Sequence, residues 1–281
     1  MPTERRIVRR LLLTLAVMTA AVRLKNLQSW FLQLIALTTL CSILSADSTA
    51  IIKTADLPIA QELRASGKKL INQKYGFTRI DDDSSYDVRT VVVTVHGLKS
   101  EGYEWVYGVR KLAQQFRHTY FYRYNWEVCP DSASMFLAKQ LSKLIGDSPG
   151  CERLIIFGHS YGGIVVTELA SRLYLNIPVE IHTIASPLRG YAALSKRCEP
   201  EIQRDGTLMF SEWETNISHF QWRTQHKLDG AFRRLKIDPQ DILITGSEVT
   251  LLPDSMNGRR LGHNWSITWV VDEFLRIPHK P

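Results

Sequence analysis

The sequence lacks the motifs that bind the common cofactors and metals. It has no G-x-x-x-x-G-K phosphate-binding loop, no G-x-G-x-x-G dinucleotide motif and no H-E-x-x-H zinc motif. Cysteine is also scarce, with four residues in 281, and these form no C-x-x-C pair and have no histidine at metal-ligand spacing. We therefore expect neither a cofactor nor a bound metal.

The few cysteines leave two arrangements open. A disulfide between Cys129 and Cys151 is compatible with an oxidising compartment. Three free thiols, in a chain that is cleaved after Cys41, are an equally good interpretation of the same spacing.

The sequence has little excess charge outside its N-terminus. The formal net charge is +7, but residues 1–50 alone hold six basic and two acidic side chains. The remaining 29 basic and 26 acidic residues leave about +3, which does not predict a nucleic-acid-binding surface. A hydrophobic content of 44% is instead typical of a globular domain with a sizeable core.

The N-terminal segment has no uninterrupted apolar run of the roughly 20 residues that span a bilayer. Its charge-free stretches are Leu11–Val22 and Trp30–Ala46, and both follow basic residues. Basic, then apolar, then small residues are typical of a secretory signal. We predict that residues 1–50 direct export to the periplasm or the extracellular space, starting at Met1 or Met18. An uncleaved membrane anchor formed by residues 1–46 is the alternative.

Residues 51–281 are predicted to form one domain in which strands alternate with helices. The strands are expected at 90–95, 119–124, 153–157, 179–185 and 241–245, and the helices near 59–73, 105–116, 137–145, 164–173 and 267–274. Such alternation favours an α/β fold with a mainly parallel central sheet flanked by helices. Residues 189–240 interrupt the rhythm, and we expect them to form a cap or lid.

One short segment carries a recognisable chemical signal. Gly158-His159-Ser160-Tyr161-Gly162 fits G-x-S-x-G and stands between a predicted strand and a predicted helix. A sharp strand-to-helix turn exposes the central serine oxygen, and flanking glycines leave room for that turn. The helix N-terminus also presents free backbone N–H groups beside the serine. This context predicts that Ser160 is a nucleophile.

Four motifs together resemble those of an α/β-hydrolase of the lipase and serine-esterase type, which includes the GPI inositol-deacylase-like esterases. They are His96-Gly97 after a buried strand, the segment 158–163, Ala185-Ser186-Pro187 after the next strand, and Leu261-Gly262-His263 before the last helix. They stand in the family's order within residues 90–275. The resemblance implies an α/β-hydrolase fold and a serine hydrolase.

The resemblance also implies roles for single residues. Ser160 corresponds to the nucleophile and His263 to the base that takes its proton. The oxyanion hole corresponds to the backbone N–H groups of Leu98, which follows His-Gly, and of Tyr161, which follows the nucleophile. The side chains of His96 and His159 are expected to serve packing or supporting roles.

The third member of the triad is less clearly marked. The family's turn after the last strand reads G-x-x-D, and here Val249 stands where the aspartate is expected. Glu248 lies one residue earlier, and Asp254 lies just beyond Pro253. A glutamate can hold the imidazole tautomer as an aspartate does. We therefore predict Glu248 as the acid, with Asp254 as the alternative.

These features predict a serine esterase or lipase that cleaves a small-molecule or lipid ester and needs no nucleic acid. The lipid-like substrate is suggested by aromatic residues of the predicted cap that are able to shelter acyl chains, namely Phe210, Trp213, Phe220, Trp222 and Phe232. Acyl transfer or thioester hydrolysis on the same triad is one alternative. A membrane-tethered binding protein that has lost activity is another, because a fold alone does not set a function.

Overall fold

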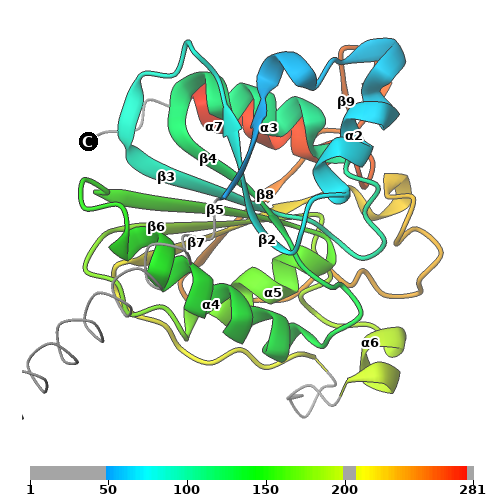
Figure 1. Ribbon diagram of the computed structural model, residues 1–281. Helices are drawn as coiled ribbons and strands as arrows, with labels where there is room; N and C mark the ends of the chain where they lie inside the picture. The colour runs from blue at the N-terminus through cyan, green and yellow to red at the C-terminus, as the bar shows by residue number, and fades with distance from the viewer. Residues whose placement is uncertain (1–48, 199–206, 277–281) are drawn as a thin grey trace, which may run out of the picture. The chain divides into compact units, whose positions relative to one another are not determined.

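The computed structural model describes residues 49–198 and 207–276 (Figure 1). The predicted export or anchor segment, residues 1–50, therefore lies outside the described residues except for its last two. Among the helices of the described ranges, none is both long and apolar enough to cross a membrane.

An eight-stranded sheet forms the centre of the domain, in the order β1-β2-β4-β3-β5-β6-β7-β8. Only the β2–β4 pair is antiparallel within this sheet. The strands are β1 (Ala50–Lys53), β2 (Gly76–Asp81), β3 (Asp87–Val95), β4 (Phe116–Arg123), β5 (Arg153–His159), β6 (Val179–Ile184), β7 (Ile217–Arg223) and β8 (Ser247–Leu251). Two short strands, β9 (Ser255–Met256) and β10 (Arg259–Arg260), form a separate hairpin.

Helices cover both faces of the sheet, with α3 and α7 on one face and α4 and α5 on the other (Figure 1). The helices are α2 (Leu63–Ile71), α3 (Tyr103–Gln115), α4 (Pro130–Gly146), α5 (Tyr161–Ala170), α6 (Ala192–Arg197) and α7 (Ser266–Arg276), with short 3₁₀ turns η1 (Thr54–Asp56), η2 (Ala60–Glu62) and η3 (His226–Leu228). The predicted mainly parallel sheet flanked by helices is confirmed.

The central strand β3 shows why a continuous β-branched sequence forms a strand that is buried on both faces. Residues 90–95 are all buried between the neighbouring strands β4 and β5. Successive side chains of a strand point to opposite faces, so Val91 and Val93 join the core under α4 and α5. Val92 joins the core under α3 and α7. An uninterrupted β-branched run is therefore what this position requires.

The strands nearest the far edge differ from the prediction. Residues 241–245 form no strand, and Leu243 is 92% exposed. The strands there are β7 and β8, and β7 lies inside the segment 189–240 that was predicted to be a cap. That segment is therefore not one insertion. The strand β7 does not show the usual alternation of apolar and polar residues in its sequence, because its buried positions include the polar residues His219 and Gln221.

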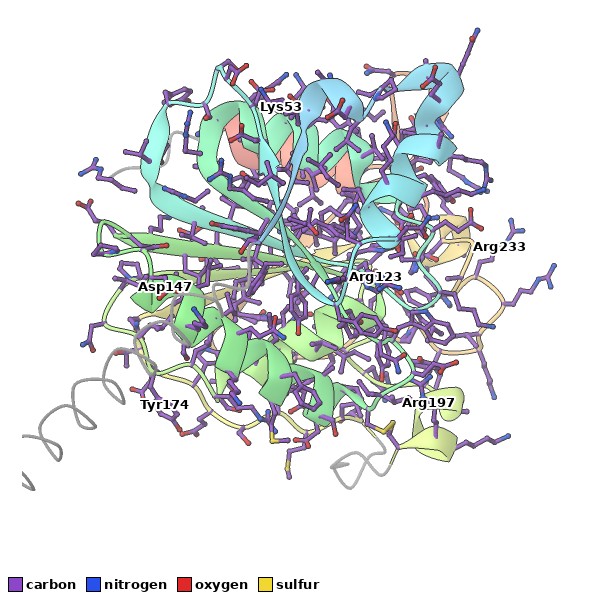
Figure 2. The ribbon with its side chains drawn as sticks, in the orientation of Figure 1. Lys53, Arg123, Asp147, Tyr174, Arg197 and Arg233 are labelled. Atoms are coloured by element: carbon purple, nitrogen blue, oxygen red, sulfur yellow. A yellow bond between two sulfur atoms is a disulfide. The ribbon has the colours of Figure 1, made fainter. Side chains whose placement is uncertain are left out.

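The cysteine pairing also differs from both predicted arrangements. Cys129 forms a disulfide with Cys198, and Cys151 is free. The disulfide joins the residue before α4 to the residue after α6, next to Arg197 (Figure 2). Arg197 donates hydrogen bonds to the hydroxyl of Tyr161 (2.8 Å) and to the carbonyl of Trp126 (3.1 Å). The tertiary fold brings the two cysteines together although they are 69 residues apart in the sequence.

Candidate active site

Ser160 lies at a sharp turn between β5 and α5. Its backbone has φ 55° and ψ −122°, a conformation that a residue with a side chain rarely adopts. The turn is possible because the neighbouring positions are glycines: a Cβ on Gly158 would overlap the carbonyl of Gly162, and a Cβ on Gly162 would overlap the carbonyl of His96. The turn is thus built from backbone geometry and close packing.

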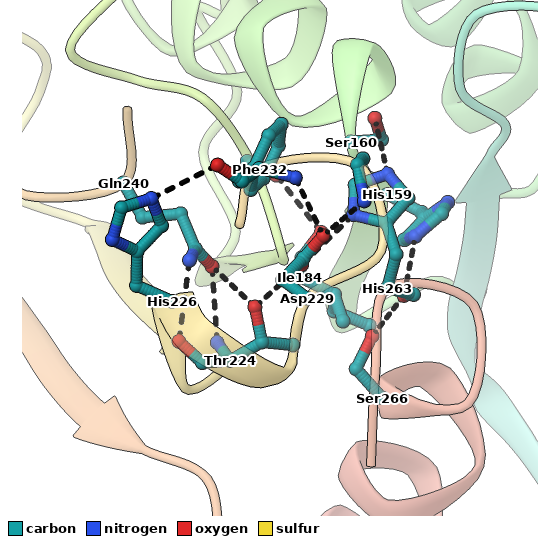
Figure 3. Close-up of polar contacts among 12 residues, drawn as sticks. His159, Ser160, Ile184, Thr224, His226, Asp229, Phe232, Gln240, His263 and Ser266 are labelled. Carbon is teal, nitrogen blue, oxygen red and sulfur yellow. Dashed lines mark hydrogen bonds and ion pairs between the residues drawn. The ribbon is translucent and has the colours of Figure 1, made fainter. Parts of the chain in front are cut away.

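His263 lies in the loop before α7, and its ring joins Ser160 to a carboxylate. Its Nε2 is 2.9 Å from Ser160 Oγ, and its Nδ1 is 3.0 Å from Asp229 Oδ2. With Nδ1–H donating to the carboxylate, Nε2 is left to accept the serine proton. Figure 3 shows this chain of hydrogen bonds, with Ser160, His263 and Asp229 contributed by three separate loops.

Asp229 is fully buried in the loop after β7 and is held by several donors. Its Oδ2 accepts a hydrogen bond from the Thr224 hydroxyl (2.6 Å), and its Oδ1 accepts from the backbone N–H of Ala231 (2.8 Å) and of Phe232 (3.2 Å). Burial by itself raises a carboxyl pKa, but the hydrogen bond and charge of His263, with these other donors, hold the pKa of Asp229 below its usual value.

A second layer of contacts fixes the turn that carries Asp229. The buried Gln240 side chain accepts a hydrogen bond from the Thr224 backbone N–H (3.0 Å) and donates one to the Thr224 carbonyl (3.2 Å). Figure 3 shows these bonds on the side of Asp229 away from His263. The acid is therefore positioned by the Thr224–Gln240 side-chain network together with the backbone N–H groups of Ala231 and Phe232.

The predicted acids are not the partners of His263. Glu248 lies in the edge strand β8, exposed and paired in register with Phe220, and Asp254 is exposed in the loop beyond it. Nδ1 of His263 is bonded to Asp229 instead. The prediction followed from taking residues 241–245 as the last strand, whereas Asp229 follows β7. Recognising Ile217–Arg223 as a strand would have pointed to it.

Both predicted oxyanion donors belong to segments next to Ser160. Gly97 packs directly against Ser160, which brings the adjoining Leu98 to the nucleophile, and Tyr161 is the first residue of α5. In the part of the chain that the structure describes, neither backbone N–H is hydrogen-bonded to an acceptor. Two free N–H groups beside a serine oxygen are suited to a developing negative charge.

Two buried histidines support this geometry. Nδ1–H of His96 donates to the Gly97 carbonyl (2.9 Å), and its Nε2 accepts from the Tyr124 backbone N–H (3.3 Å). Burial lowers the pKa of His96 to about 4. His159 donates from Nε2 to the carbonyl of His263 (2.9 Å), and burial together with the charge of His263 lowers the pKa of His159 to about 3. Through these hydrogen bonds, His96 joins the Gly97 segment to the residue after β4, and His159 holds the loop that carries His263.

The site opens into a cavity of about 190 Å³. A wider depression of about 400 Å³ adjoins it and shares Tyr103, His263 and Asn264 with it. The residues that line the first cavity are mostly polar: Gly97, Leu98, Lys99, Ser100, Glu101, Tyr103, Glu104, His159, Ser160, His263 and Asn264.

The aromatic residues predicted to shelter acyl chains line neither cavity. Phe210 and Trp213 pack against the core on the α4–α5 side, Phe220 and Trp222 belong to β7, and Phe232 packs edge-on against the ring of His263. Across residues 49–198 and 207–276, no group of three or more histidine, cysteine or acidic side chains is arranged to hold a metal ion.

The sheet order, the single antiparallel pair in that sheet and the serine at the β5–α5 turn decide the fold. The chain has the α/β-hydrolase fold. The resemblance inferred from the four sequence motifs is thus confirmed at the level of architecture.

Comparison with solved structures finds distant α/β-hydrolase neighbours. One is an α/β serine hydrolase without a lid from Xanthomonas campestris, 14% identical, with a TM-score of 0.47, covering 73% of this chain and 89% of that one. Another is the carboxylesterase CesB from Bacillus subtilis, 12% identical, with a TM-score of 0.44, covering 76% of this chain and 95% of that one. A third is Est1E from Butyrivibrio proteoclasticus, 13% identical, with a TM-score of 0.44, covering 71% of this chain and 97% of that one. No protein-family model and no curated protein matches the sequence.

Proposed function

We propose that this protein is a serine hydrolase that cleaves a carboxylic ester through an acyl-enzyme. The observation that carries the proposal is the continuous chain of hydrogen bonds from Ser160 Oγ through His263 to the buried Asp229. A serine hydroxyl is a weak nucleophile until a base accepts its proton, and the base must be held in the correct tautomer. This chain supplies both requirements.

The reaction follows from these contacts. Ser160 Oγ attacks the ester carbonyl carbon while its proton passes to His263 Nε2, and Asp229 stabilises the imidazolium that forms. The backbone N–H groups of Leu98 and Tyr161 donate to the oxyanion. Collapse expels the alkoxide, which takes the proton from His263 and leaves as the alcohol. A water molecule deprotonated by His263 then attacks the acyl-enzyme, releasing the acid and restoring Ser160.

The cavity supports a short, polar ester rather than the lipid-like ester expected from the sequence. Its volume of about 190 Å³ lies below the range of about 300–1,000 Å³ that is typical of ligand pockets, and most of its lining is polar. A long acyl chain would have to extend over the adjoining depression, which Arg260 and Trp265 help to line. Hydrolysis rates of short and long p-nitrophenyl esters distinguish the two substrate classes.

Labelling of Ser160 tests the proposed chemistry. A fluorophosphonate should modify the purified protein at Ser160, and Ser160→Ala should remove the label and reduce ester turnover by several orders of magnitude, up to about 10⁶. Labelling of Ser160→Ala at the wild-type level would overturn the assignment. Folded wild-type protein that neither labels nor turns over any ester would favour the binding-protein alternative. Ester products formed from an added alcohol would favour acyl transfer.

We also propose that the protein is exported or anchored by its N-terminus. The Cys129–Cys198 disulfide supports this because disulfides persist mainly in oxidising compartments. N-terminal sequencing of the protein from expressing cells should begin between about residues 42 and 51 if the signal is cleaved. An intact chain in the membrane fraction would favour the anchor, and an intact chain in the soluble cytoplasmic fraction would exclude both.

A further inference from the structure

The first turn of α3 brings a carboxyl group to the cavity beside Ser160 that the proposed mechanism does not use. Glu104 is 8% exposed and lines this cavity together with Ser160 and His263. Its Oε1 accepts a hydrogen bond from the Ser100 hydroxyl. Its Oε2 is buried and has no hydrogen-bond partner among the described residues. The group therefore has unused hydrogen-bonding capacity next to the nucleophile.

Burying a carboxyl group without all of its hydrogen bonds costs folding free energy. We therefore expect Glu104 to have a function that offsets this cost. Among the described residues, Glu104 is not in a salt bridge, and the charge of His263 only partly offsets the effect of burial on its pKa. Glu101 is ion-paired with Arg64 on the surface, and the side chain of Lys99 is exposed. Burial, with a smaller contribution from the negative charge of Glu101, raises the pKa of Glu104. A group that donates a hydrogen bond would relieve this cost when it enters the cavity.

A second unpartnered acceptor belongs to the same cavity wall. His159 donates from Nε2 to the carbonyl of His263, which leaves its Nδ1 as a bare acceptor. Nδ1 is buried and, within the described residues, has no hydrogen-bond donor. His159 and Glu104 both line the cavity, and the described residues supply no hydrogen-bond partner to His159 Nδ1 or to Glu104 Oε2.

We propose that Glu104 is a specificity-determining residue whose carboxyl group binds a hydrogen-bond-donating group, a hydroxyl or an ammonium, carried by the substrate close to its ester bond. This inference rests on the proposed ester hydrolysis and adds a substrate class to it. The preferred substrates are small hydroxy or amino esters. A matched apolar ester would leave the buried carboxyl without its partner, which is how a polar pocket rejects an analogue.

The test compares three methyl esters of equal length: butyrate, 3-hydroxybutyrate and 3-aminobutyrate. Wild-type protein should show a kcat/KM at least about tenfold higher on the hydroxy ester, the amino ester or both than on butyrate. Preference for the hydroxy ester alone identifies a hydroxyl as the bound group, and preference for the amino ester identifies an ammonium. Equal kcat/KM on all three esters would overturn the proposal without any variant.

Variants show whether Glu104 causes the preference. Glu104→Met, similar in volume but unable to accept strongly, should bring the ratios of kcat/KM to within about twofold of one. Glu104→Gln keeps an acceptor, and it should retain part of the hydroxyl preference and lose any ammonium preference. Glu248→Gln, which alters an exposed carboxylate on β8 that lines neither cavity, is the matched control and should keep the wild-type ratios. If Glu104→Met lowers all three rates in the same proportion, Glu104 is structural.

Fluorophosphonate labelling separates the failure of this inference from the failure of the proposed function. Wild-type protein that labels at Ser160 and hydrolyses all three esters equally retains the proposed function and refutes the role of Glu104. Protein that does not label and hydrolyses no ester refutes the proposed function itself.

Discussion

The nucleophile and the acid of the candidate site are held by two different kinds of structure. Ser160 is held by the backbone of the β5–α5 turn, where glycines allow two segments to approach each other. Asp229 is held by a network that includes side chains distant in the sequence, with Thr224 bonded to the carboxylate and Gln240 bonded to Thr224, in addition to two neighbouring backbone N–H groups. His263 joins the two. A backbone turn leaves a short, contiguous signature in the sequence, whereas a side-chain network need not.

The largest effect should come from removing the charge of the acid. Asp229→Asn keeps the size of the side chain but replaces a carboxylate, which only accepts hydrogen bonds, by an amide that is able to donate one to His263 Nδ1. This favours the tautomer in which Nε2 carries the proton and is unable to accept one from Ser160. We expect kcat to fall by up to about 10⁴ with little change in the folded state, as when the acid of a serine-protease triad becomes an amide. Ester hydrolysis and circular dichroism of the purified variant measure the two effects.

The matched controls are the acids that the sequence favoured. Glu248→Gln and Asp254→Asn alter exposed side chains that make no contact with His263, and each should change kcat less than about twofold. If Glu248→Gln instead proved the more damaging substitution, the acid would have to be reassigned from Asp229 to β8.

The parts of this molecule that were predictable are those encoded locally. The run of residues 90–95, the segment 158–163 and the histidine before α7 each carry a pattern in a few adjacent residues, and the structure brings Ser160 and His263 together. The acid was not predictable in this way, because β7 buries polar side chains that obscure its alternation. His219, for example, has its Nε2 3.1 Å from the Thr167 hydroxyl oxygen and its Nδ1 2.8 Å from the Ser247 hydroxyl oxygen.

The same distinction explains the other errors. Residues 241–245 are apolar enough to predict a strand, but Arg223 donates to the carbonyl of Ile242 and the segment runs irregularly between β7 and β8. The disulfide partner of Cys129 depends on the end of α6 lying next to the start of α4, which no local pattern specifies. Disulfide pairing and buried polar pairs depend on residues that are far apart in the sequence, so they are not evident from a short stretch of sequence.

The backbone-built half of the site should be sensitive to a single added methyl group. Gly162→Ala places a Cβ against the carbonyl oxygens of Val95 and His96, and moving this backbone would also displace Gly97 and Leu98, which follow it directly. We expect a loss of about 1–3 kcal/mol in the free energy of unfolding, together with reduced turnover. Urea denaturation measures the first effect.

The control for this substitution is Gly146→Ala at the end of α4, where an added Cβ has nothing within 4 Å. It should leave stability unchanged or raise it by a few tenths of a kcal/mol, since alanine has the higher helix propensity. A loss of stability at Gly146 as large as at Gly162 would show that steric contact at the β5–α5 turn is not the cause.

The side-chain-built half should be weakened in smaller steps. Thr224→Val keeps the shape of the side chain and removes the hydroxyl that donates to Asp229 Oδ2. The carboxylate loses one of its donors, and we expect kcat to fall by about tenfold, equivalent to about 1.4 kcal/mol, because hydrogen bonds to charged groups are worth about 1.5–3 kcal/mol. Steady-state kinetics on the best ester substrate measures this.

Rescue separates positioning of the acid from loss of packing. Thr224→Ser restores the hydroxyl without the methyl group, so it should recover most of the activity if the hydrogen bond matters. A serine variant as inactive as the valine variant would assign the effect to the methyl group and would contradict the proposed role of Thr224.

The domain also buries His159 at the end of β5 and His219 on β7, and the last prediction separates the contribution of His219 to stability by pH. Burial, with a smaller effect of the charge of His182, lowers the pKa of His219 on β7 from 6.5 to about 3. The unfolded chain therefore binds a proton between about pH 6.5 and pH 3 that the folded chain does not bind. The stability due to neutral His219 is fully present above the unfolded pKa and is lost as the pH falls below it.

Comparison of wild type with His219→Gln measures this contribution. The variant keeps a side chain able to bond to Thr167 or Ser247 but has no proton to take up. Between about pH 7 and about pH 5, the free energy of unfolding of the wild type should fall more steeply than that of the variant, by up to about 1.4 kcal/mol per pH unit. The other titrating groups, among them Asp229 and His159 at the end of β5, are common to both proteins, so their contributions cancel in the difference. Parallel pH dependences would mean that His219 takes up its proton equally in the folded and unfolded chains, and the pH sensitivity of the fold would then have to arise elsewhere, with His159 as the next residue to test by the same comparison.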